Sequence, residues 1–325
     1  MTQTDQQNVP KLRFPNFQDK WVQRPLSALV DPKRKITYGI VQPGEFVVEG
    51  VPLVRGGDYS EGWVPFESIK RVTPEIDAPY KRSRLKSNDL LITIVGANTG
   101  TIAKVPDWLD GANITQTTAR IAVDQGAADT GYVQQCLLSH IGQNEVRKYI
   151  KGAAQPGLNL ADIEKFRVPS PTLPEQRKIS CFLGMIDTKI AQLSHKKCLL
   201  DDYKKGCMQQ LFSQKIRFKD ASDKEFPDWE EINLGELVKV STGSSNREDS
   251  GTFGDYVFFD RSNDKRWSSR YLFDCEAIIV AGEGKDFPPR YFKGKFDLHQ
   301  RAYAITEFRS NIAKFLFYWI NWHRA

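Results

Sequence analysis

The stretch from Pro174 to Phe212 limits most strongly what this chain can fold into, because its pattern is that of one long helix. Apolar side chains recur in it at steps of four and three residues, as in the heptad seam of a coiled-coil helix. These positions are Ile179, Leu183, Ile186, Ile190, Leu193, Leu200, Cys207 and Leu211, with Lys197 and Lys204 filling the two gaps in register. Gly184 and Gly206 weaken the helix without ending it. A helix inside a globular core, the alternative, would show a wider apolar stripe. The predicted helix would measure about 58 Å at a rise of ~1.5 Å per residue, enough to separate two globular parts.

The residues just before it, GAAQPGLNLADIEKFRVPSPTLPEQRKIS at 152–180, predict how this helix begins. Asn159 has the character of an N-cap and predicts a brief helix over 160–165. Residues 166–168 read as a short strand that nearby prolines end. The segment Thr172-Leu-Pro-Glu175 has the spacing of a capping box, with proline tolerated in the first turn.

An internal repeat predicts one and a half copies of a single module. At one constant offset, Trp21, Leu26, Leu29 and Val30 match Trp229, Leu234, Leu237 and Val238. The other matched pairs are 88–100 with 275–284, 113–123 with 297–306 (aligning Gln116 with Gln300 and Ile121 with Ile305), and 131–141 with 311–322. We expect the second copy to lack a counterpart of 152–212. A constant frame that carries variable loops is what a recognition scaffold requires.

Basic residues are grouped along the chain, although its net charge is only +6. The groups are Lys33-Arg34-Lys35; Lys81, Arg82, Arg84 and Lys86; Arg261, Lys265, Arg266 and Arg270 around Trp267; and Lys285, Arg290, Lys293, Lys295 and Arg301 among Phe287, Tyr291 and Phe296. Basic groups mixed with aromatics suit a phosphate backbone and unstacked bases. A solvated surface is the alternative for any single group. The 325 residues suggest about two domains of ~150 residues each.

The glycine turns and their neighbours are the candidate DNA-binding positions. In the first half we expect them at Arg55, Lys81, Arg82, Arg84, Gly96, Asn98, Thr99 and Gln116. In the second half we expect them at Arg266, Lys285, Arg290, His299, Gln300 and Arg301. Arginine can bridge O6 and N7 of guanine, and Gln or Asn can bridge N6 and N7 of adenine. Lysines suit phosphate contacts, which set register without reading sequence. Gln116 and Gln300 could equally be structural hydrogen-bonding residues.

Signatures of catalysis are sparse in this sequence. It has no phosphate-binding GxxxxGK[ST] loop, no HExxH motif, and no Asn-Pro-Pro-aromatic motif of amino-methyltransferases. Asp274, Glu283 and Lys285 have the D…ExK spacing of Mg²⁺-dependent nucleases, which is the alternative function. The matching turn of the first copy lacks this set, which favours loop variation over catalysis.

Neither export nor a membrane span is expected. The chain has no apolar run near the ~20 residues that a transmembrane helix needs, and residues 1–8 are polar. The five cysteines are scattered without CxxC spacing, which predicts free thiols in a reducing cytoplasm.

The arrangement resembles the specificity subunit of type I restriction-modification systems (HsdS) over nearly the whole chain. The most specific pieces are AAQPGLNLADIEKFRVPSPTLPEQRKIS and GKFDLHQRAYAIT. The resemblance implies an α/β (α+β) fold with two target recognition domains joined by a long coiled-coil helix. It places the first recognition domain at 1–151, the conserved linker and long helix at 152–214, and the second recognition domain at 215–325, incomplete because the second conserved helix is missing.

The resemblance also implies a function. The chain would be a non-catalytic subunit that binds a bipartite site in double-stranded DNA and docks methyltransferase (M) and restriction/translocase (R) subunits. It would hold no cofactor or metal itself, with S-adenosylmethionine, ATP and Mg²⁺ on the partner subunits. Because the second helix is missing, we expect homodimerisation or pairing with a separate S fragment through the long helix.

Overall fold

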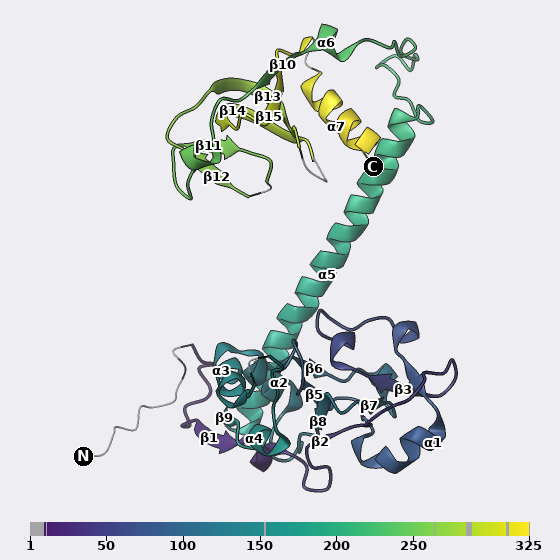
Figure 1. Cartoon of the computed structure of the whole chain (residues 1–325), viewed down its shortest axis with the longest axis vertical. Coiled ribbons are helices and arrows are strands. Elements are labelled where there is room, and N and C mark those ends of the chain that lie inside the picture. The colour runs from purple at the N-terminus through teal and green to yellow at the C-terminus, as the bar shows by residue number, and fades with distance from the viewer. Residues whose placement is uncertain are drawn as a thin grey trace, which may run out of the picture. The chain divides into compact units, whose positions relative to one another are not determined.

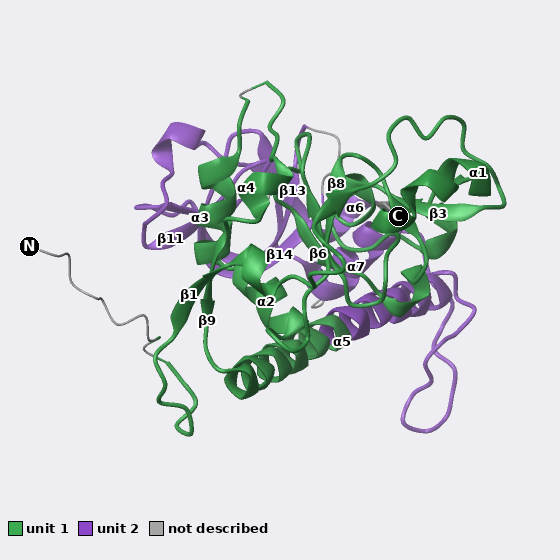
Figure 2. Cartoon of the chain, turned by 90° about the horizontal axis from the view of Figure 1, so that it is seen from below, with its two compact units in different colours: residues 1–192 green, residues 193–325 purple. Residues whose placement is uncertain are grey.

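The computed structural model describes residues 10, 12–152, 154–262, 264–283, 288–309 and 312–324. The chain forms two compact units, residues 1–192 and residues 193–325 (Figure 2). Each unit combines helices with sheet, and one long helix continues from the first into the second, so the predicted fold class is confirmed. Within the described residues, no helix combines the length and apolar character that a membrane span requires. The five cysteines carry free thiols.

Unit 1 is built on short strands because its apolar runs are brief and end at glycine or proline. Its main sheet is antiparallel and has the order β2 (Thr37–Tyr38), β8 (Thr118–Ile121), β5 (Leu90–Thr93) and β6 (Ile102–Lys104). A second sheet contains β4 (Arg71–Val72), β3 (Val51–Val54) and β7 (Asn113–Ile114), and a third pairs β1 (Val22–Pro25) with β9 (Arg167–Ser170). The helices are α1 (Pro74–Asp77), α2 (Thr130–Leu138), α3 (His140–Tyr149) and α4 (Leu160–Ile163).

The strand β5 is buried on both faces, which explains its uninterrupted apolar sequence. Leu90 and Ile92 face a cluster that includes Val133 and Phe166, while Leu91 faces a second cluster. The alternation follows from the two-residue period of a strand. Helices α2 and α3 lie on the β9 side of the unit, and α1 and β3 lie on the other (Figure 1).

Unit 2 centres on one six-stranded sheet. Its order is β10 (Lys239–Thr242), β15 (Ala302–Thr306), β13 (Phe273–Ala281), β14 (Arg290–Leu298), β11 (Tyr256–Phe259) and β12 (Arg266–Ser268). All neighbours are antiparallel except β11 and β14. The helices of this unit are α6 (Leu234–Leu237) and α7 (Ala313–Arg324). Ile278, Ile305 and Leu316 form the core under α7.

The internal repeat is visible in close backbone contacts that occur at matching positions in both units. A Cβ on Gly39 would lie 1.7 Å from the carbonyl oxygen of Ile114, and one on Gly243 would lie 1.8 Å from that of Leu298. No other residue type fits at either crossing without backbone movement. Asn113 and Asp297 also match, because each is fully buried and accepts a hydrogen bond from a serine hydroxyl at 2.7 Å. The two units therefore share a frame, as the sequence alignment predicted.

The helix α5 spans Leu173–Phe212, so the predicted long helix is confirmed (Figure 1). Ile179 packs against the core of unit 1, but the middle of the heptad seam faces solvent. The exposed fractions are 41% for Ile186, 57% for Ile190, 54% for Leu193 and 55% for Leu200. A helix inside a globular core would bury these side chains. Their exposure therefore excludes the alternative of a core helix.

Three local predictions at the start of α5 need correction. The brief helix is α4, Leu160–Ile163, but the Asn159 side chain makes no cap hydrogen bond. The predicted strand over 166–168 is β9, Arg167–Ser170, so its first proline lies within it. The predicted capping box does not form, because the Glu175 carboxylate accepts hydrogen bonds from Arg13 and Trp21 instead.

Candidate nucleic-acid interface

Two basic groups that lie far apart in sequence meet in unit 1. Residues 32–37, 81–82 and 84–86, together with Asp110, Gly111 and Arg120, line one surface cavity of about 710 Å³. Its cationic side chains are Lys33, Arg34, Lys35, Lys81, Arg82, Arg84, Lys86 and Arg120. We call this feature the basic cavity. The sequence indicated both groups, but only the fold shows that they share one site.

Arg120 in β8 holds the two walls of the basic cavity together. Its side chain is 1% exposed and donates hydrogen bonds to the carbonyl oxygens of Lys35 at 3.1 Å and Arg82 at 3.0 Å. Within the described residues its Nε has no hydrogen-bond partner. Burial, and then the nearby charge of Arg34, lowers the pKa of Arg120. Sequence analysis missed this residue, although an arginine inside the apolar strand ARIAV is the signal that could have found it.

Carboxylates neutralise two of the cavity's arginines. Arg34 forms a two-pronged ion pair with Asp89, with both nitrogen–oxygen distances at 2.7 Å, and Arg84 pairs with the buried Asp77. The remaining exposed cations are Lys33, Lys35, Lys81, Arg82 and Lys86. In the described part of the chain, none of these five forms an ion pair. Five uncompensated cations around one cavity favour an anion with several oxygens, such as a run of phosphates.

The predicted glycine turn of unit 1 borders a second cavity, of about 740 Å³, lined by Tyr59, Trp63, Asn98, Thr99, Gln134 and Gln143 among others. Positive φ angles of 105° at Gly96 and 94° at Gly100 allow the turn. The Thr99 hydroxyl donates to backbone carbonyl oxygens and so holds the turn, whereas Asn98 is exposed. Trp63 packs edge-on against Trp108. An exposed amide near aromatic rings is suited to contacting a base.

The two other predicted residues of unit 1 lie away from these cavities. Arg55 is paired with Asp58 at 2.8 Å within a short 3-10 turn. Gln116 is half-buried and its backbone N–H donates to the carbonyl oxygen of Ile40. In both, the observed contacts serve the local fold.

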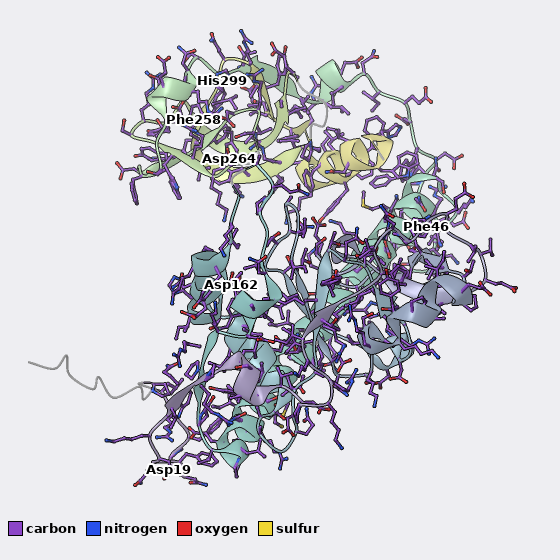
Figure 3. All side chains as sticks on the ribbon, turned by 60° about the horizontal axis from the view of Figure 1, so that its bottom comes forward. Asp19, Phe46, Asp162, Phe258, Asp264 and His299 are labelled. Atoms are coloured by element: carbon purple, nitrogen blue, oxygen red, sulfur yellow. The ribbon has the colours of Figure 1, made fainter. Side chains whose placement is uncertain are left out.

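Three predicted residues of unit 2 are tied into its structure. Arg290 donates to the carbonyl oxygens of Asp260 and Ser262 and lies over the Phe259 ring at 5.0 Å, and burial lowers its pKa. Arg266 donates to the Ser250 hydroxyl at 2.8 Å. His299 is 9% exposed, and its ring lies edge-on to that of Phe258. Both residues are labelled in Figure 3.

Gln300 and Arg301 are the exposed predicted residues of unit 2, at the turn between β14 and β15. The Gln300 amide donates to Asn246 Oδ1 at 2.7 Å. Arg301 lies 3.3 Å from the Glu283 carboxylate, which also pairs with Arg261 at 2.7 Å. Asn246 and Arg261 are neighbours that sequence analysis did not include as site residues. They come from other loops, which the sequence alone does not place beside Gln300.

The described part of the alternative nuclease set gives no support for nuclease chemistry. Glu283 is occupied by two arginines, and Lys285 lies outside the described residues. Among the described side chains, no group of three or more His, Cys, Asp or Glu is arranged to hold a metal ion. Nothing in the geometry therefore favours nuclease chemistry.

Comparisons with known proteins agree with this geometry. Residues 48–199 match the family model described as the type I restriction modification DNA specificity domain. The chain is 33% identical over 161 residues to the type I restriction enzyme EcoBI specificity subunit of Escherichia coli, covering 50% of this chain and 34% of that protein. It is 25% identical over 219 residues to the type I restriction enzyme MjaVIII specificity subunit of Methanocaldococcus jannaschii, covering 63% of this chain and 50% of that protein.

Among solved structures, the fold is similar to a type I restriction-modification system S subunit from M. genitalium. The TM-score is 0.65 at 15% identity, over 97% of this chain and 80% of that one. At this identity the likeness concerns the fold alone. This chain spans between a third and a half of the length of the two curated relatives.

Proposed function

We propose that this chain, whose residues 48–199 match the type I restriction modification DNA specificity domain, reads DNA sequence for a type I restriction-modification complex. The observation that carries the proposal is the basic cavity. Its five uncompensated cations suit a phosphate backbone, and the cavity beside Asn98 offers amide and aromatic groups for bases.

The division of labour within each unit follows from the chemistry of the side chains. Lys81 and the other exposed lysines act on phosphates as point charges, which sets affinity and register but not sequence. Asn98 in unit 1, and Gln300 with Arg301 in unit 2, are the exposed groups that would read base edges. The residues with internal partners, such as Thr99 and Arg290, hold the reading loops in place.

The recognised site is bipartite in this proposal. Two units that share one frame but carry different loops would each read one half of the site. The helix α5 would set the spacing between the halves, because a helix changes length by a fixed ~1.5 Å per residue.

The chain itself would be non-catalytic. Methyl transfer and DNA cleavage, with S-adenosylmethionine, ATP and Mg²⁺, would belong to methyltransferase and restriction subunits docked on this chain. The names of the relatives, which are specificity subunits of restriction enzymes, support this assignment. The exposed seam of α5 offers one docking surface, for a partner subunit, a second copy of this chain or a separate S fragment.

Direct binding to double-stranded DNA tests the proposal. The purified chain is mixed with a labelled duplex at a series of salt concentrations, with and without Mg²⁺. We expect binding that weakens steeply as salt rises, and no cleavage. Absence of binding at low salt would contradict the proposal. It would favour a different function for the heptad helix, that of a coiled-coil assembly protein with no role on DNA. Cleavage by the chain alone with Mg²⁺ would favour the nuclease alternative.

A further inference from the structure

Unit 2 contains a buried carboxylate of which only one oxygen is satisfied. Asp297 is fully buried, and its Oδ1 accepts hydrogen bonds from the Ser245 hydroxyl at 2.7 Å and the Leu298 N–H at 2.9 Å. Among the described residues, its Oδ2 has no hydrogen-bond partner. Arg270 Nε lies 3.9 Å from this oxygen, which is beyond hydrogen-bonding distance. A buried charge in this state costs stability, which indicates a role beyond the fold.

Arg270 is held only loosely beside this carboxylate. Its side chain is 54% exposed, and its Nη2 donates to the Ser245 hydroxyl at 3.0 Å and lies 3.6 Å from the Asp249 carboxylate. By contrast, Arg34 of unit 1 is 21% exposed and meets Asp89 at 2.7 Å through two nitrogens. Within the described residues, Nη1 of Arg270 makes no hydrogen bond. The outer part of this guanidinium is therefore available to a ligand.

The charges around Arg270 do not favour a phosphate contact. The carboxylates of Asp249 and Asp297 lie 3.6 and 3.9 Å from its nitrogens, so two negative charges face one positive charge. A phosphate would meet no excess of positive charge at this place. The edge of guanine is uncharged, and its O6 and N7 accept hydrogen bonds from the two arms of an arginine.

Arg270 lies next to Gln300, which is proposed above to read base edges. Ser245 joins the two residues, because its hydroxyl accepts from Arg270 and its carbonyl oxygen accepts from the Gln300 N–H at 3.0 Å. The Gln300 side chain continues to Asn246, the neighbour of Ser245. Sequence analysis placed Arg270 in a basic group but not among the site residues, since the loop of Ser245 is distant in sequence.

The place of Arg270 in the frame can be located in unit 1. The N–H groups of Leu272 and Leu85 donate to the carbonyl oxygens directly before Asp297 and Asn113, at 3.0 and 2.8 Å. Asp297 and Asn113 are the buried residues that match between the units. The residue two positions before each leucine therefore occupies the same place in both units.

This place holds Arg270 in unit 2 and Ser83 in unit 1. Ser83 is buried, and its hydroxyl donates to Asn113 Oδ1 at 2.7 Å. Asn113 Nδ2 donates to Asp77 at 2.7 Å, so both polar atoms of the asparagine side chain are satisfied. Unit 2 instead sets a half-exposed cation against a buried anion. A place that differs between two copies of one frame is suited to giving them different base preferences.

We propose that Arg270 is a specificity-determining residue of unit 2 that reads guanine, and that Asp297 is its positioning residue. Asp297 and Ser245 hold one edge of the guanidinium and so direct Nη1 and Nη2 outward as a fixed pair of donors. O6 and N7 of guanine accept from this pair. The inference rests on the proposed function, because it names the base that one residue of the reading surface recognises.

Selection of the whole chain on a randomised duplex library, followed by sequencing, tests the role of Arg270. We expect the unaltered chain to select a motif that contains a G·C pair. Arg270→Ser, which copies Ser83 of unit 1, should lower the preference for one such pair by about tenfold and keep the rest of the motif. Arg270→Lys should lower it as much, because lysine keeps the charge but lacks the planar fork. Lys224→Ser, which removes another exposed cation of unit 2, is the control and should keep the whole motif.

Asp297→Asn tests the positioning role with a side chain of the same size. Asn113 occupies the matched place in unit 1, so the fold should be kept, which urea denaturation checks. Preference for the same G·C pair should fall by less than in Arg270→Ser, and it should fall no further when the two changes are combined. A change in stability with no change in base preference would show that Asp297 is merely structural.

A duplex with 7-deazaguanine at the selected position tests the contact without relying on the fold of a variant. This base lacks the N7 acceptor, so the unaltered chain should bind it about tenfold more weakly than guanine. Arg270→Lys should bind both duplexes equally. Selection of no motif by the unaltered chain would overturn the proposed function, and this inference with it. A motif that Arg270→Ser leaves unchanged, or equal binding of both bases by the unaltered chain, would overturn the assignment of Arg270 alone.

Discussion

The guanidinium of Arg120 lies 3.0 Å from the carbonyl oxygen of Arg82, a residue 38 positions away in sequence. The same Nη2 reaches the carbonyl oxygen of Lys35 at 3.1 Å. One buried side chain in β8 therefore fixes both basic segments by their backbones, and leaves their charged side chains directed to the basic cavity. Preorganised cations lose less entropy when they contact phosphates than cations on loose loops would.

Arg120→Met should destabilise the chain, because it leaves buried carbonyl oxygens without donors. We expect a loss of about 1–3 kcal/mol in the free energy of unfolding, the usual penalty for such groups. Urea denaturation followed by circular dichroism measures it. Lys35→Met, at an exposed position in the same cavity, is the control and should stay within about 0.5 kcal/mol. Equal stability of both variants would show that Arg120 does not support the cavity.

Lys81→Ala should reduce the salt dependence of DNA binding. Loss of one phosphate contact lowers the slope of log K against log salt by about 1, with equal effect on all sequences. Fluorescence anisotropy over a salt series measures the slope. Lys224→Ala, an exposed lysine of unit 2 away from the predicted site residues, is the matched control. A slope changed equally by both variants would count against the basic cavity as the phosphate site.

Gln300→Ala should alter which bases unit 2 accepts while leaving the other half of the site unchanged. The amide is exposed, and among the described residues Asn246 is its one hydrogen-bond partner, so its removal disturbs little of the fold. Loss of one base contact costs about 1–3 kcal/mol at one position. Binding to a randomised duplex library, followed by sequencing, gives the preference. Thr306→Ser, in buried β15, should preserve it. An unchanged motif in Gln300→Ala would remove this residue from the reading surface.

Gly243→Ala should destabilise the chain, because the new methyl group would lie 1.8 Å from the carbonyl oxygen of Leu298. Backbone must move to admit it, at about 1–3 kcal/mol. Thermal and urea unfolding measure the loss. Gly235→Ala has open space around the new Cβ and serves as the control. Comparable stability of the two variants would show that the crossing at Gly243 is not tight.

How well the sequence predicted a feature depends on how far apart in the chain its interacting residues lie. The heptad pattern gave α5 within one residue of its start, since helical periodicity is local. The capping box at Thr172 was wrong because Arg13, 162 residues away, takes the Glu175 carboxylate. Asn159 likewise precedes a helix without capping it. Local sequence rules identify a candidate hydrogen-bond partner for a side chain, but the tertiary fold can bring a stronger partner to it.

The candidate site shows the same limit. Lys33-Arg34-Lys35 and Lys81-Arg82 were recognisable as basic groups, but their meeting depends on Arg120, whose hydrogen bonds to the backbones of both groups no local pattern specifies. Arg290 was predicted as a base reader from its residue type. The fold gives its guanidinium the carbonyl oxygens of Asp260 and Ser262, and no sequence rule places those loops beside it.

The central claim is that two matched units read one split site at a spacing set by α5. The most direct test is a genome-wide map of methylated bases in cells that co-express this chain with its methyltransferase, without and with four residues inserted near Lys197. The insertion lengthens the helix by ~6 Å, less than two base pairs. We predict a bipartite motif whose halves stay the same and whose gap grows. An undivided motif, or a gap unchanged by the insertion, would contradict the account.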